Sequence, residues 1–99
     1  MAKLKNIHPG EVLKKEFLEP LELSMYRLSK DILVPQTRIS EVIKGRRSIS
    51  ADTALRLSLY FGNSTNFWLG LQNDFDIEQE KKLNSKELAK IKVAKYDWV

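Results

Sequence analysis

The 99-residue sequence contains no cysteine and only one histidine, His8. Without cysteine the chain forms no disulfide, thiolate metal site or thiol nucleophile, and one histidine is too few for a multi-histidine metal site. The sequence also offers no paired nucleophile and base, and no glycine-rich phosphate loop among its four glycines. We therefore expect a protein that is not an enzyme, with no catalytic residue, no metal site and no cofactor.

Long apolar segments are missing as well. No run approaches the ~18–20 apolar residues that span a bilayer. The stretch MAKLKNIHPG at residues 1–10 has no apolar core of the kind found in export signals. We expect no membrane contact and a cytoplasmic location.

What the sequence does contain is an uneven distribution of charge. Seventeen Lys and Arg against thirteen Asp and Glu give a net charge of +4. Between residues 27 and 47 there are six basic residues and only two acids, whereas a run of lysines follows an acidic stretch at residues 74–80. A focused basic excess permits nucleic-acid binding without establishing it. We expect one domain over residues 1–81 and a lysine-rich tail over residues 82–99.

Helix start and stop signals divide the chain into five predicted helices. Pro9 suits a first helical position, and Pro20 must end that helix or kink it. The expected N-caps of later helices are Ser24, Ser50 and either Ser64 or Thr65, and the expected terminators are Gly45 and Gly62. The fold class is therefore all-α. The tail stays open between helix, edge strand and disorder, because its apolar residues have mixed spacing.

The segment 24–45 has the form of a helix, a short break and a second helix. The second helix places Ile39, Val42 and Ile43 on one face, which anchors it to the domain, and polar side chains on the other. The major groove of DNA admits one α-helix, and such side chains match base edges there. The predicted base contacts are Gln36, Thr37, Arg38, Ser40 and Lys44, and the predicted backbone contacts are Arg46, Arg47 and Arg27.

Two features have a second interpretation that the residues alone leave open. A short helix with a polar outer face and a basic loop also suits an ordinary solvated surface. The apolar residues of the fifth helix either close the core or seed a dimer contact; we favour the dimer contact for Phe67, Trp68, Leu71 and Phe75.

Several stretches resemble one branch of the phage-repressor/Cro helix-turn-helix proteins, the HigA/VapI-type antitoxins. They are IHPGE at 7–11, EFLEPL at 16–21, ISEVIKGRR at 39–47, SADTALRL at 50–57 and FWL with LQ at 67–72. Three positions depart from the family pattern. Leu33 stands where glycine is usual, Met25 where Gln or Thr often contacts phosphate, and Pro35 where Ser or Thr is frequent.

The resemblance implies a lambda-repressor-like fold and a bacterial, nucleoid-associated homodimer. It implies that the dimer binds a palindromic operator in its own promoter and represses it. It also implies a partner, a small toxin that cleaves messenger RNA and is neutralised in the complex. Two other hypotheses remain: a stand-alone phage-type regulator without a toxin, and a protein-interaction module that kept the fold but lost DNA binding.

Overall fold

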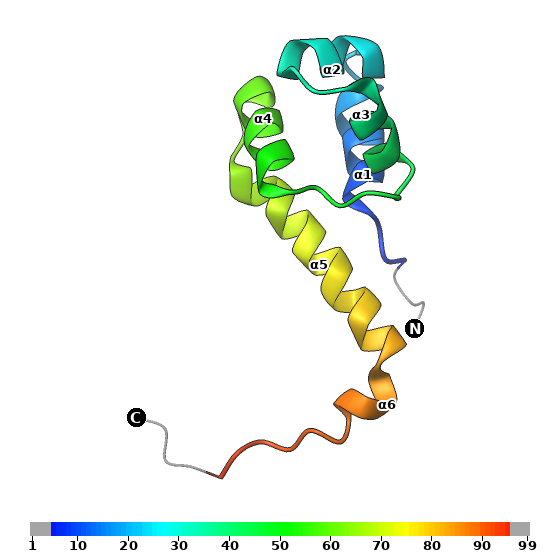
Figure 1. The fold of residues 1–99 in the computed structure, drawn as a ribbon, viewed down its shortest axis with the longest axis vertical. Helices are drawn as coiled ribbons and strands as arrows, with labels where there is room; N and C mark the ends of the chain where they lie inside the picture. Colours follow the sequence, from blue (N-terminus) through cyan, green and yellow to red (C-terminus); the bar gives the residue numbers. More distant parts are fainter. Residues whose placement is uncertain (1–4, 96–99) are drawn as a thin grey trace.

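The computed structural model describes residues 5–95, so the first four residues of the predicted domain and the last four of the predicted tail lie outside it. A helical bundle forms the head of the molecule, and a long helix leads from it to the tail (Figure 1). The elements in chain order are α1 (Pro9–Val12), the π-helical segment η1 (Leu13–Leu18), α2 (Met25–Ile32), α3 (Gln36–Ile43), α4 (Ala51–Phe61), α5 (Thr65–Leu83) and α6 (Ser85–Leu88).

The serine caps and glycine terminators act where the sequence predicts them. Ser24 and Ser64 each accept a hydrogen bond at 3.0 Å from the backbone N–H three residues on, and Ser50 accepts one at 3.3 Å. Gly45 and Gly62 adopt φ values of 75° and 76°, which suit glycine at a helix end. The all-α fold is confirmed. The first predicted helix comprises α1 and η1, and the third begins at Gln36, with Pro35 as its N-cap.

The core lies where α1, η1, α2, α3, α4 and the first half of α5 meet. Its fully buried large side chains come from every one of these elements, and they include Leu13, Leu28, Ile39, Leu57 and Trp68. Phe17 of η1 packs against the ring of Trp68, with a centroid distance of 4.9 Å. The largest of these side chains, Trp68, comes from α5. The first half of α5 is therefore part of the bundle core.

The start of α1 fits closely against the end of α3. A Cβ placed on Gly10 would lie 1.9 Å from the carbonyl oxygen of Val42, so only glycine allows the two backbones to approach this far. His8 caps α1, as its Nδ1 accepts a hydrogen bond from the Gly10 N–H at 2.9 Å. The His8 ring also meets the edge of Phe75 on α5 at 4.8 Å, and burial lowers the pKa of this imidazole. Contacts of His8 and Gly10 therefore join the start of α1 to both α3 and α5.

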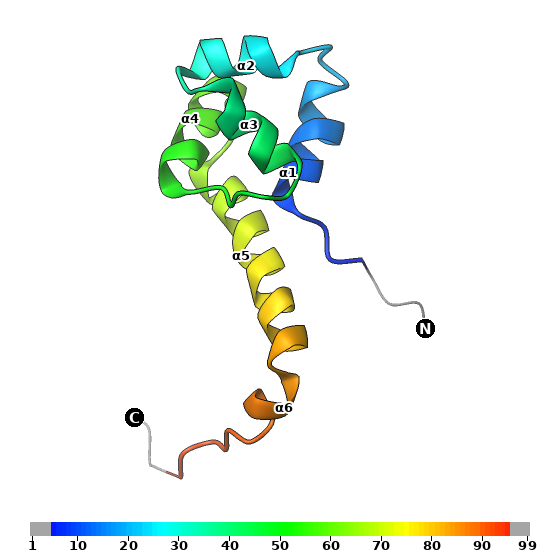
Figure 2. The same ribbon diagram turned by 45° about the vertical axis from the view of Figure 1, so that its right-hand side comes forward.

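The second half of α5 projects beyond the bundle (Figure 2). Every residue from Asp76 to Lys95 is exposed, and α5 ends at Leu83, two residues past the predicted boundary between domain and tail. The tail contains the short α6, and no strand forms between residues 84 and 95. None of the helices described in residues 5–95 has both the length and the apolar character to cross a membrane.

Candidate nucleic-acid interface

The turn between α2 and α3 forms without glycine. Leu33 takes φ 62° and ψ 47°, the left-handed conformation that glycine normally supplies. A single non-glycine residue in this region costs about 1–2 kcal/mol. The Leu33 side chain is 81% exposed, so it meets no obstacle there. Leucine therefore takes the left-handed conformation at the position where the sequence departs from the family pattern.

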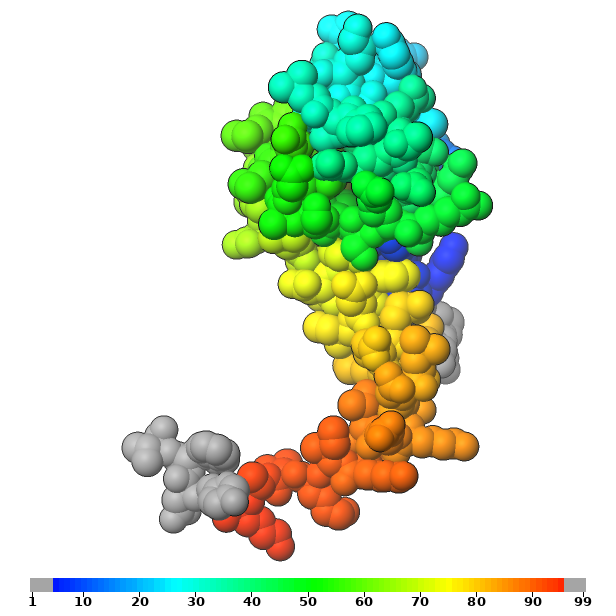
Figure 3. Space-filling view, viewed as in Figure 1, coloured from blue at the N-terminus to red at the C-terminus, as the bar shows by residue number. Residues whose placement is uncertain are grey.

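Helix α3 and its C-cap residue, Lys44, present a strip of polar side chains to the outside, which we call the polar strip: Gln36, Thr37, Ser40 and Lys44. Gln36, Thr37 and Lys44 are exposed and Ser40 is half-buried, while Ile39 and Val42 beneath them are fully buried. In the space-filling view of Figure 3 the turquoise-green surface of α3 faces the viewer, and neither α5 nor the tail covers it. A short exposed helix with this outer face has the width and the hydrogen-bonding groups to enter a major groove.

The predicted backbone-contacting cations lie beside the polar strip, but they differ in their surroundings. Arg47 pairs with Glu41 at 3.3 Å, and Arg27 pairs with Asp31 at 3.1 Å. Within residues 5–95, Lys44 and Arg46 have no ion-pair partner. Lys44 and Arg46 therefore supply free positive charge next to α3, which is the kind of charge that phosphates attract.

Arg38 lies at the flank of the polar strip and is held by a neighbouring acid. Its Nη1 donates to Asp52 Oδ2 on α4 at 2.6 Å, and the Nε of Arg56 lies 3.1 Å from both oxygens of the same carboxylate. Arg56 Nη1 also donates to the carbonyl oxygen of Ile32 at 2.8 Å, at the end of α2. We call Arg38, Asp52 and Arg56 the Asp52 cluster.

The electrostatics of the Asp52 cluster keep it ionised. Hydrogen bonds from Arg38 and then from Arg56 lower the pKa of the Asp52 carboxyl below its usual value. A similar contact lies behind α2, where the Tyr60 hydroxyl donates to Asp31 at 2.7 Å and lowers the pKa of that carboxyl. Asp52 and Arg56 are not among the site residues predicted from the sequence, although their four-residue spacing on a predicted helix favours an ion pair.

Gln72 connects α5 to the loop that follows α3. Its side chain is buried, and its Oε1 accepts a hydrogen bond from the Ile49 N–H at 2.8 Å. Its Nε2 donates to Asp76 Oδ1 at 2.9 Å, which fixes the amide orientation. The loop carrying Arg46 and Arg47 is thereby tied to α5. The LQ pair of the family motif thus has a structural role.

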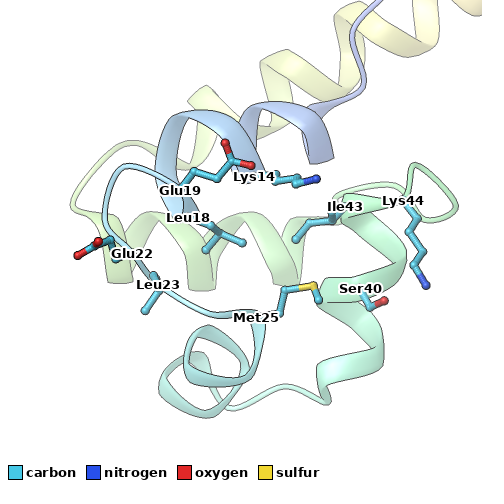
Figure 4. Close-up of a pocket in the computed structure, with 9 residues that line it drawn as sticks. All are labelled: Lys14, Leu18, Glu19, Glu22, Leu23, Met25, Ser40, Ile43 and Lys44. Carbon is cyan, nitrogen blue, oxygen red and sulfur yellow. The ribbon is translucent and has the colours of Figure 1, made fainter.

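An apolar groove of about 540 Å³ borders the polar strip (Figure 4). Its apolar lining includes Leu18, Leu23, Met25 and Ile43, and the Ser40 and Lys44 side chains form part of its edge. Met25 extends toward Ser40 in this view. Met25 is half-buried and packs against the core, so at the start of α2 it serves packing.

The four residues predicted to form a dimer contact lie in different environments. Trp68 is fully buried inside its own chain, with its Nε1 donating to Asn63 at 2.9 Å, so it has no surface to offer a second subunit. Phe67 is 40% exposed, and Leu71 and Phe75 are half-buried. The structure therefore corrects the prediction of a dimer contact for Trp68. Its large indole fills the centre of the bundle and belongs to the core.

A bundle that presents a polar-faced helix after a tight turn is the arrangement of a helix-turn-helix domain. A helix-turn-helix family model matches residues 14–68. Virulence-associated protein I of Dichelobacter nodosus is 46% identical over 79 residues, covering 77% of this chain and 73% of that protein.

Two solved structures share the fold over most of this chain. One is an addiction module antidote protein of the HigA family from Coxiella burnetii, with TM-score 0.85 and 40% identity, covering 94% of this chain and 100% of that one. The other is the Pseudomonas aeruginosa antitoxin HigA with the higBA promoter, with TM-score 0.85 and 34% identity, covering 89% and 97%. The chain belongs to the helix-turn-helix family, in its HigA/VapI-type branch.

Proposed function

We propose that the protein is a sequence-specific DNA-binding repressor that acts as the antitoxin of a toxin–antitoxin module. The observation that carries the proposal is the uncovered polar strip of α3, held on a buried apolar face and flanked by free cations. The strip reads base edges in the major groove, and Arg46, Arg47 and Arg27 contact the sugar-phosphate backbone. Within this proposal the protein performs no catalysis of its own.

The proposal includes a homodimer on a palindromic operator. Exposed apolar side chains on α4 and α5 support it: Leu55 is 51% exposed, Leu59 84%, Phe67 40% and Ile77 52%. Apolar area left in water on two neighbouring helices favours burial against a second copy. Two-fold symmetry then places the half-sites about 10–10.5 base pairs apart, or a multiple of that.

The toxin partner and the location of the protein rest on the relatives. The similar structures include an antitoxin with its promoter, and the family resemblance implies a small messenger-RNA-cleaving toxin as partner. A repressor of this kind acts in the bacterial cytoplasm, on the nucleoid. A short reading frame next to this one, toxic when expressed alone, supports the antitoxin role, and its absence supports a stand-alone regulator.

The proposed function predicts a large preference for the operator over random DNA. We expect anisotropy titrations at fixed salt to show binding to the upstream palindrome at least about 10³-fold tighter than to a random duplex of equal length. Thr37→Ala should cost about 1–3 kcal/mol on the operator and relax its sequence preference. Arg46→Ala should weaken both duplexes alike and reduce the salt slope by about one.

The two variants act as controls for each other, because one removes a base contact and the other a phosphate contact. Equal affinity of the wild-type protein for both duplexes contradicts the repressor role. Equal losses from Thr37→Ala on the operator and on random DNA contradict the role assigned to the polar strip.

A further inference from the structure

We infer that Asp52 and Arg56 are positioning residues for operator reading, which hold Arg38 of α3 in one orientation and fix the turn before that helix. The inference rests on the proposed function, since it concerns how Arg38 meets DNA. It starts from the Asp52 cluster, which joins α3 and α4 to the end of α2 through side-chain hydrogen bonds of 2.6–3.1 Å.

Stability alone does not account for the cluster. The Asp52 side chain is 53% exposed, and those of Arg38 and Arg56 are 27% and 37% exposed. Ion pairs at such exposure contribute little to folding, because water screens the charges and ordering the side chains costs entropy. The clear consequence of the contacts is geometric: they select one orientation for a long side chain at the edge of the polar strip.

The chemistry of the guanidinium makes this orientation useful. Arg38 uses its Nη1 toward Asp52, and the planar group has five N–H donors in a fixed fork. Recognition of guanine requires two donors aimed together at O6 and N7. An arginine already fixed by an acid loses less freedom on binding than a mobile one, so Asp52 prepares Arg38 for this contact.

The charge of the cluster suits a position next to phosphates. An isolated carboxylate on this face repels the DNA backbone. Arg56 lies within hydrogen-bond distance of both oxygens of Asp52, so the three side chains together carry one positive charge. Arg56 therefore lets Asp52 orient Arg38 without an electrostatic penalty toward DNA.

Arg56 also acts on the turn itself. Besides the Ile32 carbonyl, its Nη1 lies 3.4 Å from the carbonyl oxygen of Leu33, the residue in the left-handed conformation. A cation at the end of α2 interacts favourably with the unpaired carbonyls there. One side chain thus supports both the strained turn and the acid that holds Arg38.

The test compares Asp52→Ala with Asp74→Ala, which removes the same charge from an exposed site on α5. For each variant, anisotropy titrations give the ratio of the dissociation constants for random duplex and operator, and urea unfolding gives stability. We expect Asp52→Ala to lower this ratio roughly ten-fold, as loss of one good base contact does. Asp74→Ala should leave the ratio unchanged.

A double variant separates positioning from an independent role. If Asp52 acts through Arg38, the ratio for Arg38→Ala with Asp52→Ala together equals that for Arg38→Ala alone. Losses that multiply overturn the inference, as does an Asp52→Ala protein that keeps the wild-type ratio. Should Asp52→Ala shift the urea midpoint, Asp52→Asn, which keeps the side-chain volume, replaces it in the same comparison.

The outcomes distinguish this inference from the proposed function. A wild-type protein that prefers the operator, with a preference insensitive to Asp52, overturns the positioning role and leaves the repressor role intact. A wild-type protein that binds the operator and random DNA equally contradicts both the positioning role and the repressor role.

Discussion

Replacing Gly10 with alanine is expected to destabilise the protein by at least about 3 kcal/mol, a large part of the 5–15 kcal/mol that holds a domain folded. The added Cβ would lie 1.9 Å from the carbonyl oxygen of Val42 and 2.9 Å from the Cα of Ile43. Both atoms belong to the backbone of α3 or its end, so no side-chain rotation relieves the clash. Either α1 moves away from α3 or α3 itself shifts.

A second glycine supplies the matched control. Gly70 lies inside α5, and a Cβ built there meets nothing within 4 Å. Gly70→Ala should therefore stabilise the protein by about 0.5–1 kcal/mol, because alanine loses less backbone entropy in a helix. Thermal unfolding followed by circular dichroism measures both, with a fall of about 12 °C or more expected for Gly10→Ala. A Gly10→Ala protein as stable as the wild type contradicts the close packing of α1 on α3.

Replacing Trp68 with alanine should cost about 3–5 kcal/mol of folding free energy. The indole is fully buried, and it packs against the rings of Phe17 at 4.9 Å and Phe67 at 5.0 Å. Its removal leaves a cavity at the centre of the bundle and frees the Asn63 side chain that accepts its N–H. Urea unfolding at a fixed protein concentration measures the loss.

Phe67 is the control for Trp68, because it is the adjacent residue but is 40% exposed. Phe67→Ala should cost less than about 2 kcal/mol of stability, since much of its ring already lies in water. It should weaken the proposed dimer in sedimentation experiments, whereas Trp68→Ala should act on folding. A Trp68→Ala protein with the wild-type urea midpoint contradicts its place in the core.

Local signals predicted the helices well because the forces that set helix ends act over a few residues. Ser24, Ser50 and Ser64 bond to backbone groups three residues away, and Gly62 needs only its own backbone freedom. Leu33 shows the limit of such signals. The sequence shows leucine where the family usually has glycine, but only the structure shows that Leu33 adopts the left-handed conformation.

The candidate site likewise has one part that the sequence predicts and another part that it does not. The polar strip follows from the spacing of apolar residues on α3, so its exposure could be predicted from sequence. The Arg38–Asp52 contact joins residues fourteen positions apart on different helices, and the Gln72–Ile49 contact joins residues twenty-three apart. Such contacts depend on how helices pack. For the same reason the periodicity of α5 left open whether Trp68 faces the core or a partner.

The most direct test of the central claim, that the polar strip lies along a groove of duplex DNA, is an amide NMR titration of the wild-type protein with its operator. The largest changes are expected at Gln36, Thr37, Ser40 and Lys44, with little change over residues 76–83 of α5. Changes centred on α5 or the tail, with the α3 amides unaffected, would contradict the account.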